Sequence, residues 1–337
     1  MKRISAVVWT GLVVTGLLGP VGVSQAQEKA REMNLAMQTN PGTAQYDGVE
    51  KFAQLVKDKS KGKLTVKIFG GGALGGDLQV VSSLQGGTVE ITQMNASLLN
   101  GLVKEFSVLD FPFLFNTEEE AYAVVDGPVG KKLMDKLPEK GIVGLSYPEL
   151  GFRHIHNSKR PVKTAADLKG LKIRVIQTPV YIDTINAMGA NATPLPFPEV
   201  YSALEQKTVD GATNPLVTIP VMKFNEVQKY LTITRHQYNP QIIIISKRVW
   251  DKLSPDEQKV LQEAANEARD FERKVSREKN AQALVELKKT MEITELPPAE
   301  IDKMREAVKP VIDKHAKTVG EDLVKEVNAE IAKVRKK

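Results

Sequence analysis

The chain of 337 residues contains no cysteine. This absence excludes disulfide bonds, thiolate metal sites and a cysteine nucleophile, so the fold depends on its hydrophobic core. The sequence also lacks the Gly-x-Ser-x-Gly elbow of serine hydrolases and the His-Glu-x-x-His pattern of zinc peptidases. Hydrolytic catalysis therefore has no specific support.

Long apolar runs and clustered charge are equally scarce. After residue 26 no apolar stretch is long enough to cross a bilayer, and the run from Gln241 to Ser246 has the length of a buried strand. Aromatic residues make up 6% of the chain and do not alternate with basic clusters, and the formal charge is only +6. These features argue against nucleic-acid binding.

The first 26 residues have the organisation of a secretory signal peptide. Lys2 and Arg3 precede an apolar stretch, which a run of small residues ending at Ala26 follows. An uncleaved membrane anchor is the alternative, but the apolar stretch is short and interrupted by glycine. We expect cleavage after about Ala26, export to the periplasm and a mature charge of +4, because the leader carries two cations and no acid.

Strand and helix patterns alternate along the mature chain, which predicts an α/β fold with a parallel or mixed sheet covered by helices. Its length suits two domains. The predicted strands are 32–37, 64–69, 89–94, 141–147, 171–176 and 208–214, and the predicted helices include 118–125, 130–137, 179–188, 198–207 and 215–230, one that ends at Lys59 and a last helical region after Pro298.

One helix is expected to be unusually long. Ser254, Pro255 and Glu257 form a helix start, and neither glycine nor proline recurs before Pro297. An unbroken helix over 255–289 would reach about 50 Å and could span two domains. The expected division is therefore 27–150 plus about 236–254 for the first domain, 151–235 plus about 290–337 for the second, and the helix 255–289 across both.

A glycine-rich loop at 70–76 matches Gly-x-Gly-x-x-Gly, and Glu90 falls near the position of a ribose contact in dinucleotide folds. However, a strand and a helix of the mature chain already precede this loop, and an exported protein rarely meets free NAD. We therefore favour a flexible loop that lines a cleft, where glycine permits close approach to a ligand or another backbone.

Two histidines, His154 and His156, share one face of a strand and could in principle bind metal together. No zinc-binding spacing accompanies them, so structural roles are favoured and no metal or cofactor is expected.

Polar residues gather where predicted strands end: Asn95, Arg153, Arg174 and Asn214. Arginine fits a carboxylate with two parallel hydrogen bonds, and asparagine can both donate to and accept from ligand oxygens. For Arg174 two interpretations remain. Arg174 and Lys172 share one face of the strand, so both side chains could simply be exposed to solvent. The alternative is an anion site facing the helix that starts at Pro179.

Several motifs in order resemble the solute-binding subunits of TRAP transporters, the tripartite ATP-independent periplasmic systems. They are NSKRP at 157–161, DLKGLKIRV at 167–175, MGA at 188–190, PFPEVY at 196–201, VDGATNP at 209–215 and KFNEVQKY at 223–230, joined by GGD at 75–77 and DFPF at 110–113. The resemblance implies a two-domain periplasmic-binding-protein fold with mixed sheets, crossing hinge strands and one long domain-spanning helix, which closes over its ligand.

The resemblance also implies roles for individual residues. Arg174 of the Lys-Ile-Arg-Val motif would form a bidentate salt bridge with the ligand carboxylate, and Arg153 would support the same anion or a neighbouring hydroxyl. Asn214 and Phe197 would complete this end of the site, although Ala212-Thr213 replaces the more usual Gln-Glu before Asn214. Residues of the first domain would contact the far end of the ligand: Gln38, Asp77 and Asn95.

The far-end residues, together with Glu149, offer more hydrogen-bonding groups than a plain C4-dicarboxylate needs. We therefore expect a sugar acid, with a hexuronate such as glucuronate or galacturonate ahead of an aldonate and a C4-dicarboxylate as the alternative. The expected protein is a monomer that passes this organic acid to membrane permease subunits and is not an enzyme. An exported sugar-acid lyase or hydrolase is the competing class of function.

Overall fold

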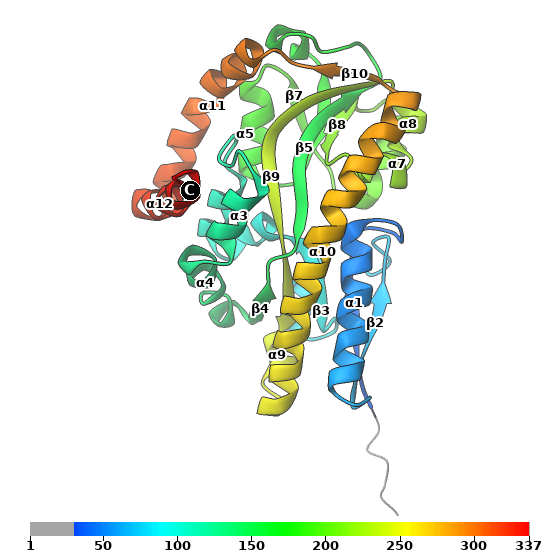
Figure 1. The fold of residues 1–337 in the computed structure, drawn as a ribbon, viewed down its shortest axis with the longest axis vertical. Helices are drawn as coiled ribbons and strands as arrows, with labels where there is room; N and C mark the ends of the chain where they lie inside the picture. Colours follow the sequence, from blue (N-terminus) through cyan, green and yellow to red (C-terminus); the bar gives the residue numbers. More distant parts are fainter. Residues whose placement is uncertain (1–29, 337) are drawn as a thin grey trace, which may run out of the picture.

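A computed structural model describes residues 30–336, so the predicted signal peptide lies outside the described residues. Strands and helices alternate through most of the chain, and helices cover a mixed sheet (Figure 1). No helix within 30–336 combines the length and apolar character that a membrane span requires. The α/β fold with two domains is confirmed.

The first half of the chain builds one end of the molecule. α1 begins after Thr43, whose side chain accepts from the Tyr46 backbone N–H, and it ends where predicted, at Lys59. The elements are β1 (Arg31–Ala36), α1 (Ala44–Lys59), β2 (Leu64–Phe69), α2 (Asp77–Gly86), β3 (Ile91–Asn95), the 3-10 helices η1 (Ala96–Gly101), η2 (Lys104–Asp110) and η3 (Pro138–Lys140), α3 (Glu118–Val125), α4 (Pro128–Met134) and β4 (Ile142–Ser146).

The second half builds the other end and returns to the first. Its elements are β5 (Glu149–Asn157), η4 (Ala165–Leu168), β6 (Lys172–Val175), α5 (Pro179–Ala187), β7 (Asn191–Pro194), η5 (Phe197–Glu199), α6 (Val200–Glu205), β8 (Gly211–Asn214), α7 (Thr218–Val221), α8 (Phe224–Val227), β9 (Tyr230–Ser246), α9 (Lys247–Trp250), α10 (Pro255–Thr290), β10 (Glu292–Glu295), α11 (Pro298–Val319) and α12 (Glu321–Arg335).

The single helix predicted for 215–230 is wrong. Two short helices, α7 and α8, occupy this segment, and Lys223 between them adopts a left-handed conformation with φ 59° that an α-helix cannot continue. Tyr230 is already the first residue of β9. The run Gln241–Ser246, predicted as a complete strand, is only the last part of this 17-residue strand.

β5 and β9 are the strands that cross between the two halves. The sheet order is β2-β1-β3-β9-β5-β8-β6-β7, with β4 and β10 also paired to β9. β9 therefore runs antiparallel to β3 and β4 at one end and pairs with β5 and β10 at the other. The pairing of β5 with β9 is interrupted between Arg153 and Ile155, where Arg235 has φ 46°.

His154 stabilises this interruption. Its Nδ1 accepts from the backbone N–H groups of Thr234 at 3.2 Å and Arg235 at 3.4 Å. Burial lowers the pKa of His154 to about 3, so the imidazole stays neutral and able to accept. The structural role expected for His154 fits these contacts.

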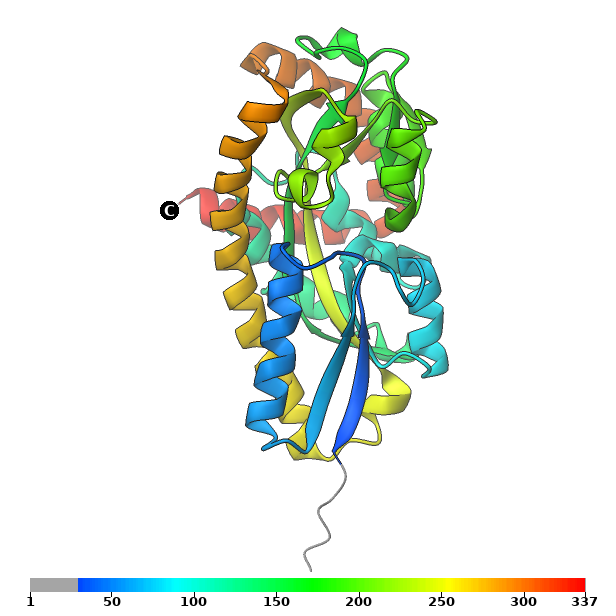
Figure 2. The ribbon, with the colours of Figure 1, turned by 90° about the vertical axis from the view of Figure 1, so that its right-hand side faces the viewer.

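α10 runs along both halves of the molecule (Figure 2). Its 36 residues correspond to about 54 Å, and Ser254 and Glu257 form the expected capping box. At one end it packs on α1 and β4 with a core that includes Phe52, Leu261 and Ala265, and at the other it contacts α7 and β10. The long domain-spanning helix is confirmed.

The last two helices contact elements of both halves. α11 packs on α5 and η2, whereas α12 packs on α3 and α4, and Arg335 of α12 bonds the carboxylate of Glu120. The final segment, predicted to belong to the second domain, thus also contacts the first half of the chain. The exact domain limits stay a prediction.

Candidate ligand-binding site

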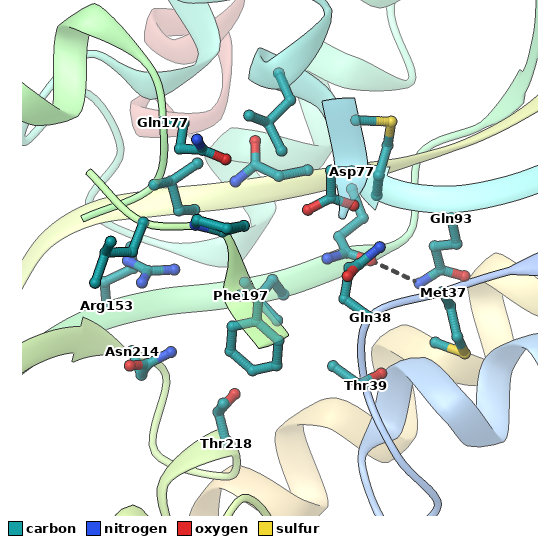
Figure 3. A pocket seen from close by; sticks show the side chains of 18 of the residues that line it. Met37, Gln38, Thr39, Asp77, Gln93, Arg153, Gln177, Phe197, Asn214 and Thr218 are labelled. Atoms are coloured by element: carbon teal, nitrogen blue, oxygen red, sulfur yellow. Dashed lines mark hydrogen bonds between the residues drawn. The ribbon is translucent and has the colours of Figure 1, made fainter. Parts of the chain in front are cut away.

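A pocket lies between the two halves, and seven of the eight residues predicted to bind ligand line it (Figure 3). β5, β6 and β8 supply Arg153, Arg174 and Asn214, and Phe197 comes from η5. The wall built by the first half carries Gln38, Asp77 and Asn95. That these side chains bind a ligand stays a prediction, but the fold brings them together around one cavity.

Arg174 is buried, with 2% of its surface exposed. Its Nε and Nη2 donate to the Leu195 carbonyl oxygen at 3.0 and 2.6 Å, while its Nη1 is enclosed and has no partner among the described residues. The guanidinium lies 5.8 Å from the centre of the Phe197 ring. Burial and the nearby Arg153 lower the pKa of Arg174 to about 9. The solvated alternative considered for Arg174 is therefore wrong.

Arg153 is also buried, but the protein already occupies each of its nitrogens. Nε donates to the Thr213 hydroxyl at 2.9 Å, Nη1 donates to Asn239 Oδ1 at 2.8 Å, and Nη2 donates to the Thr213 carbonyl. The Asn239 amide nitrogen donates in turn to Asp110 at 3.3 Å. Arg153 is thus held rigidly, and only its second Nη hydrogens are available to a ligand.

His156 fixes the amide of Asn214. The Nε2 atom of His156 lies 3.0 Å from Asn214 Oδ1, and its Nδ1 lies 3.1 Å from Gln228 Oε1. Burial lowers the pKa of His156 to about 4. Both ring nitrogens are engaged with amides, and no group of three or more potential ligands that could hold a metal ion occurs within residues 30–336.

Among the described residues, the opposite wall leaves mainly oxygen atoms without a partner, together with one donor, Asn95 Nδ2. Gln38 donates through Nε2 to the Gly75 carbonyl at 3.1 Å, which leaves its Oε1 enclosed and unpartnered among the described residues. Asp77 is partly exposed as a residue, yet its Oδ1 is also enclosed and unpartnered within that part of the chain. Burial raises the pKa of the Asp77 carboxyl to about 7, against the opposing effects of Arg174 and Gln38.

The glycine-rich loop 70–76, which joins β2 to α2, lies against the other half of the protein. A Cβ atom on Gly72, which has φ 73°, would lie 2.5 Å from Pro198 Cγ of the other half. Close approach to another part of the chain therefore explains this glycine without a nucleotide.

Sequence reasoning missed five polar residues of the pocket lining: Thr39, Gln93, Gln177, Thr218 and Gln241. A signal existed for Gln177, which directly follows the predicted strand 171–176. Gln93 and Gln241 lie inside strands, where alternation shows that residues share a face but not which face lines a pocket. With them, the lining contains six amide side chains: Gln38, Gln93, Asn95, Gln177, Asn214 and Gln241.

The prediction for Glu149 needs a correction, because this residue does not line the pocket. Its carboxylate instead accepts from the hydroxyls of Tyr122 at 2.6 Å and Tyr238 at 2.7 Å. Its backbone N–H donates to Glu272 of α10 at 2.8 Å. Regular alternation would put Glu149 on the same face as Arg153, but the pairing of β5 with β9 shifts in register between Glu149 and Gly151, where Gly151 has φ 100°. The side chain of Glu149 is instead held by α3 and β9, and its backbone by α10.

Comparisons with known proteins agree with this architecture. Residues 35–318 match the family model described as bacterial extracellular solute-binding protein, family 7. The 2,3-diketo-L-gulonate-binding periplasmic protein YiaO of Escherichia coli K12 is 37% identical over 77% of this chain and 79% of its own length.

Two solved structures share the fold closely. A TRAP periplasmic solute-binding protein from Ochrobactrum anthropi, with its C-terminus bound in the ligand-binding pocket, is 54% identical, with a TM-score of 0.81 over 91% of this chain and 96% of that chain. The sugar acid-binding protein of Advenella mimigardefordensis, in complex with galactonate, is 42% identical, with a TM-score of 0.89 over 90% and 99%. The chain therefore belongs to the family 7 extracellular solute-binding proteins, the binding components of TRAP transporters.

Proposed function

We propose that this protein captures a sugar acid, with a hexuronate such as glucuronate or galacturonate as the first candidate, and delivers it to a TRAP permease. One observation carries the proposal. The second-half wall offers an unpartnered donor at Arg174, and the first-half wall offers unpartnered acceptor oxygens on Gln38, Asp77 and Gln93. A carboxylate can accept from the second-half wall, and hydroxyl groups can donate to the first-half wall.

The same division disfavours a C4-dicarboxylate. An ionised carboxylate accepts hydrogen bonds but cannot donate them, so a second carboxylate would leave the oxygens of Gln38 and Gln93 unpaired and would lie near the Asp77 carboxyl. Both cations that line the pocket, Arg153 and Arg174, belong to the second-half wall. A hydroxylated monocarboxylate meets neither problem.

An aldonate is the second candidate, because the relative that is 42% identical binds galactonate. Uronates and aldonates both carry one carboxylate and several hydroxyls, so the division of donors and acceptors accommodates either. The six amides of the lining suit both as well, since each amide can donate to one hydroxyl and accept from another.

The proposed mechanism is capture by closure of the two halves around the acid. Closure removes water from the Arg174 guanidinium and strengthens its salt bridge with the carboxylate. The ligand favours the closed state because only that state brings both walls into contact with it. Export to the periplasm, a monomeric state and release to the membrane permease complete the proposal.

A panel of acids measured by differential scanning fluorimetry and isothermal titration calorimetry tests this function. We expect stabilisation by glucuronate, galacturonate or galactonate and little or none by succinate and malate. Stabilisation by the dicarboxylates alone would refute the sugar-acid assignment. Prolonged incubation with a bound uronate should return the ligand unaltered, whereas a new product would reveal the competing lyase or hydrolase activity.

A further inference from the structure

Gln93 and Gln241 form a buried amide pair at one end of the pocket. Gln93 is 2% exposed and Gln241 is 8% exposed. Gln93 Nε2 donates to Gln241 Oε1 at 3.0 Å. In the register of β3 with β9, Gln93 lies opposite Ile243 and Asn95 lies opposite Gln241, so Gln93, Asn95 and Gln241 share one face of the sheet. All three line the pocket.

The pair leaves one acceptor and one donor unused. Gln93 Oε1 is enclosed and has no partner among the described residues, and the Gln241 amide nitrogen donates to none of those residues. A hydroxyl group can serve both atoms, because it donates one hydrogen bond and accepts others. A carboxylate cannot donate to Gln93, and a methyl group would leave both atoms unpaired.

The pair is remote from the carboxylate-binding wall. Three strands, β9, β5 and β8, separate β3 from the β6 strand of Arg174. Figure 3 shows Gln93 on the opposite side of Phe197 from Arg153 and Asn214, with Gln38 and Asp77 between. The pair thus lies at the end of the pocket that is away from Arg153 and Asn214.

We propose that Gln93 and Gln241 together bind the hydroxyl group furthest from the ligand carboxylate and so set the length of acid that the pocket selects. This inference rests on the proposed sugar-acid function and deepens it. The selectivity follows from the amide pair, since the enclosed Oε1 of Gln93 remains unsatisfied beneath a ligand that is too short.

The test measures binding of six-carbon galacturonate, glucuronate and galactonate, and of four-carbon threonate, by calorimetry. The variants are Gln93→Met and Gln241→Met, which keep side-chain length but remove the amide, and the control is Gln206→Met, an exposed residue at the C-cap of α6. Each pocket variant should bind the preferred six-carbon acid roughly 10- to 100-fold more weakly than the wild type does. Its affinity for that acid should then approach the affinity of the wild type for threonate. Gln206→Met should bind as the wild type does.

A double variant adds a test of the pair. Because either substitution breaks the shared contact, Gln93→Met with Gln241→Met should lose little more than either change alone. Equal losses for four- and six-carbon acids, no loss, or fully additive losses in variants with wild-type circular dichroism would overturn the inference. If the wild type binds no sugar acid, the proposed function itself fails, which the wild-type titration reveals separately.

Discussion

The two walls of the pocket differ in how much of their hydrogen bonding the protein itself completes. On the wall of the second half, each nitrogen of Arg153 already donates to Thr213 or Asn239, and Arg174 keeps one unpartnered nitrogen. On the wall of the first half, Gln38, Asp77 and Gln93 each keep an unpartnered oxygen. The second-half wall is thus preorganised for one anion, while the first-half wall depends on the ligand to complete its hydrogen bonds.

This difference predicts the largest effect for Arg174→Met. The variant should lose on the order of 100- to 1,000-fold in affinity, because a buried charge pair loses its cation. Its unliganded form should be at least as stable as the wild type, since the variant no longer buries a cation without a counterion. Calorimetry and thermal unfolding check both, with Arg160→Ala on the surface as the control. Unchanged affinity would exclude Arg174 from the site.

Asp77→Asn should have the next largest effect on affinity. Asparagine replaces a carboxyl, whose ionised form accepts from ligand hydroxyls, by a neutral amide, so we expect roughly 10- to 100-fold weaker binding of the sugar acid. Binding of a dicarboxylate should weaken less or improve, because the like charge is removed. Calorimetry with one acid of each type measures the ratio, and an unchanged ratio would contradict the assigned contrast between the walls.

The stability of the same variant relative to the wild type should depend on pH, in a direction that the pKa of Asp77 determines. Burial raises the pKa of Asp77 from 3.8 to about 7, so ionisation costs more in the folded protein than in the unfolded chain. The protonated carboxyl avoids this cost, so the folded state is more stable at low pH and loses that stability as pH rises from 3.8 to about 7. Unliganded Asp77→Asn should therefore gain in melting temperature over the wild type between pH 5 and pH 8. If the difference in melting temperature between variant and wild type stays constant over this range, the pKa of Asp77 is not raised.

Phe197→Ala should have a smaller effect, roughly 5- to 20-fold in affinity. It removes the ring 5.8 Å from the Arg174 guanidinium and an apolar surface for the ligand, while the salt bridge stays. Phe197→Leu separates the two contributions, because leucine restores apolar surface without the ring. If Phe197→Leu binds like the wild type, the ring has no specific electrostatic role.

Glu149→Gln should have the smallest effect on affinity, within about threefold, because Glu149 lies outside the pocket lining. Its effect should appear in stability. Burial and Glu149 raise the pKa of Glu272 well above its usual value, so the neutral glutamine should relieve the repulsion between β5 and α10 as pH rises and these carboxyls ionise. Thermal unfolding measures this effect, and a tenfold loss of affinity would instead place Glu149 in the binding machinery.

Local patterns predicted the elements that depend on local chemistry. The capping box at Ser254 marked α10, and helix 118–125 and strand 64–69 match α3 and β2 residue for residue. The motif at 167–175 located Arg174 correctly in the pocket. The helices and the strand rest on periodicity, caps and turns, which neighbouring residues determine, whereas Arg174 was located by the resemblance of its motif to a family.

Features set by tertiary packing could not be predicted in this way. The pattern around Tyr230 did not separate helix from strand, because the pairing of β9 with β5 and β10 decides it. Glu149 was grouped with the residues opposite Arg174, although its carboxylate accepts from Tyr122 and Tyr238 outside the pocket. Gln93 and Gln241 were missed because only the register of β3 and β9 shows that they share a face.

The interruption in β9 also has a consequence for how this chain tolerates changes in length. In an unbroken strand, one inserted residue turns every later side chain to the other face of the sheet. Here Arg235 and its neighbours already stand outside the regular pairing with β5. We expect an insertion or deletion at this point to be absorbed locally, so that Gln241 keeps its face while the other end of β9 keeps its own partners. The irregularity insulates each half of the protein from length changes in the other.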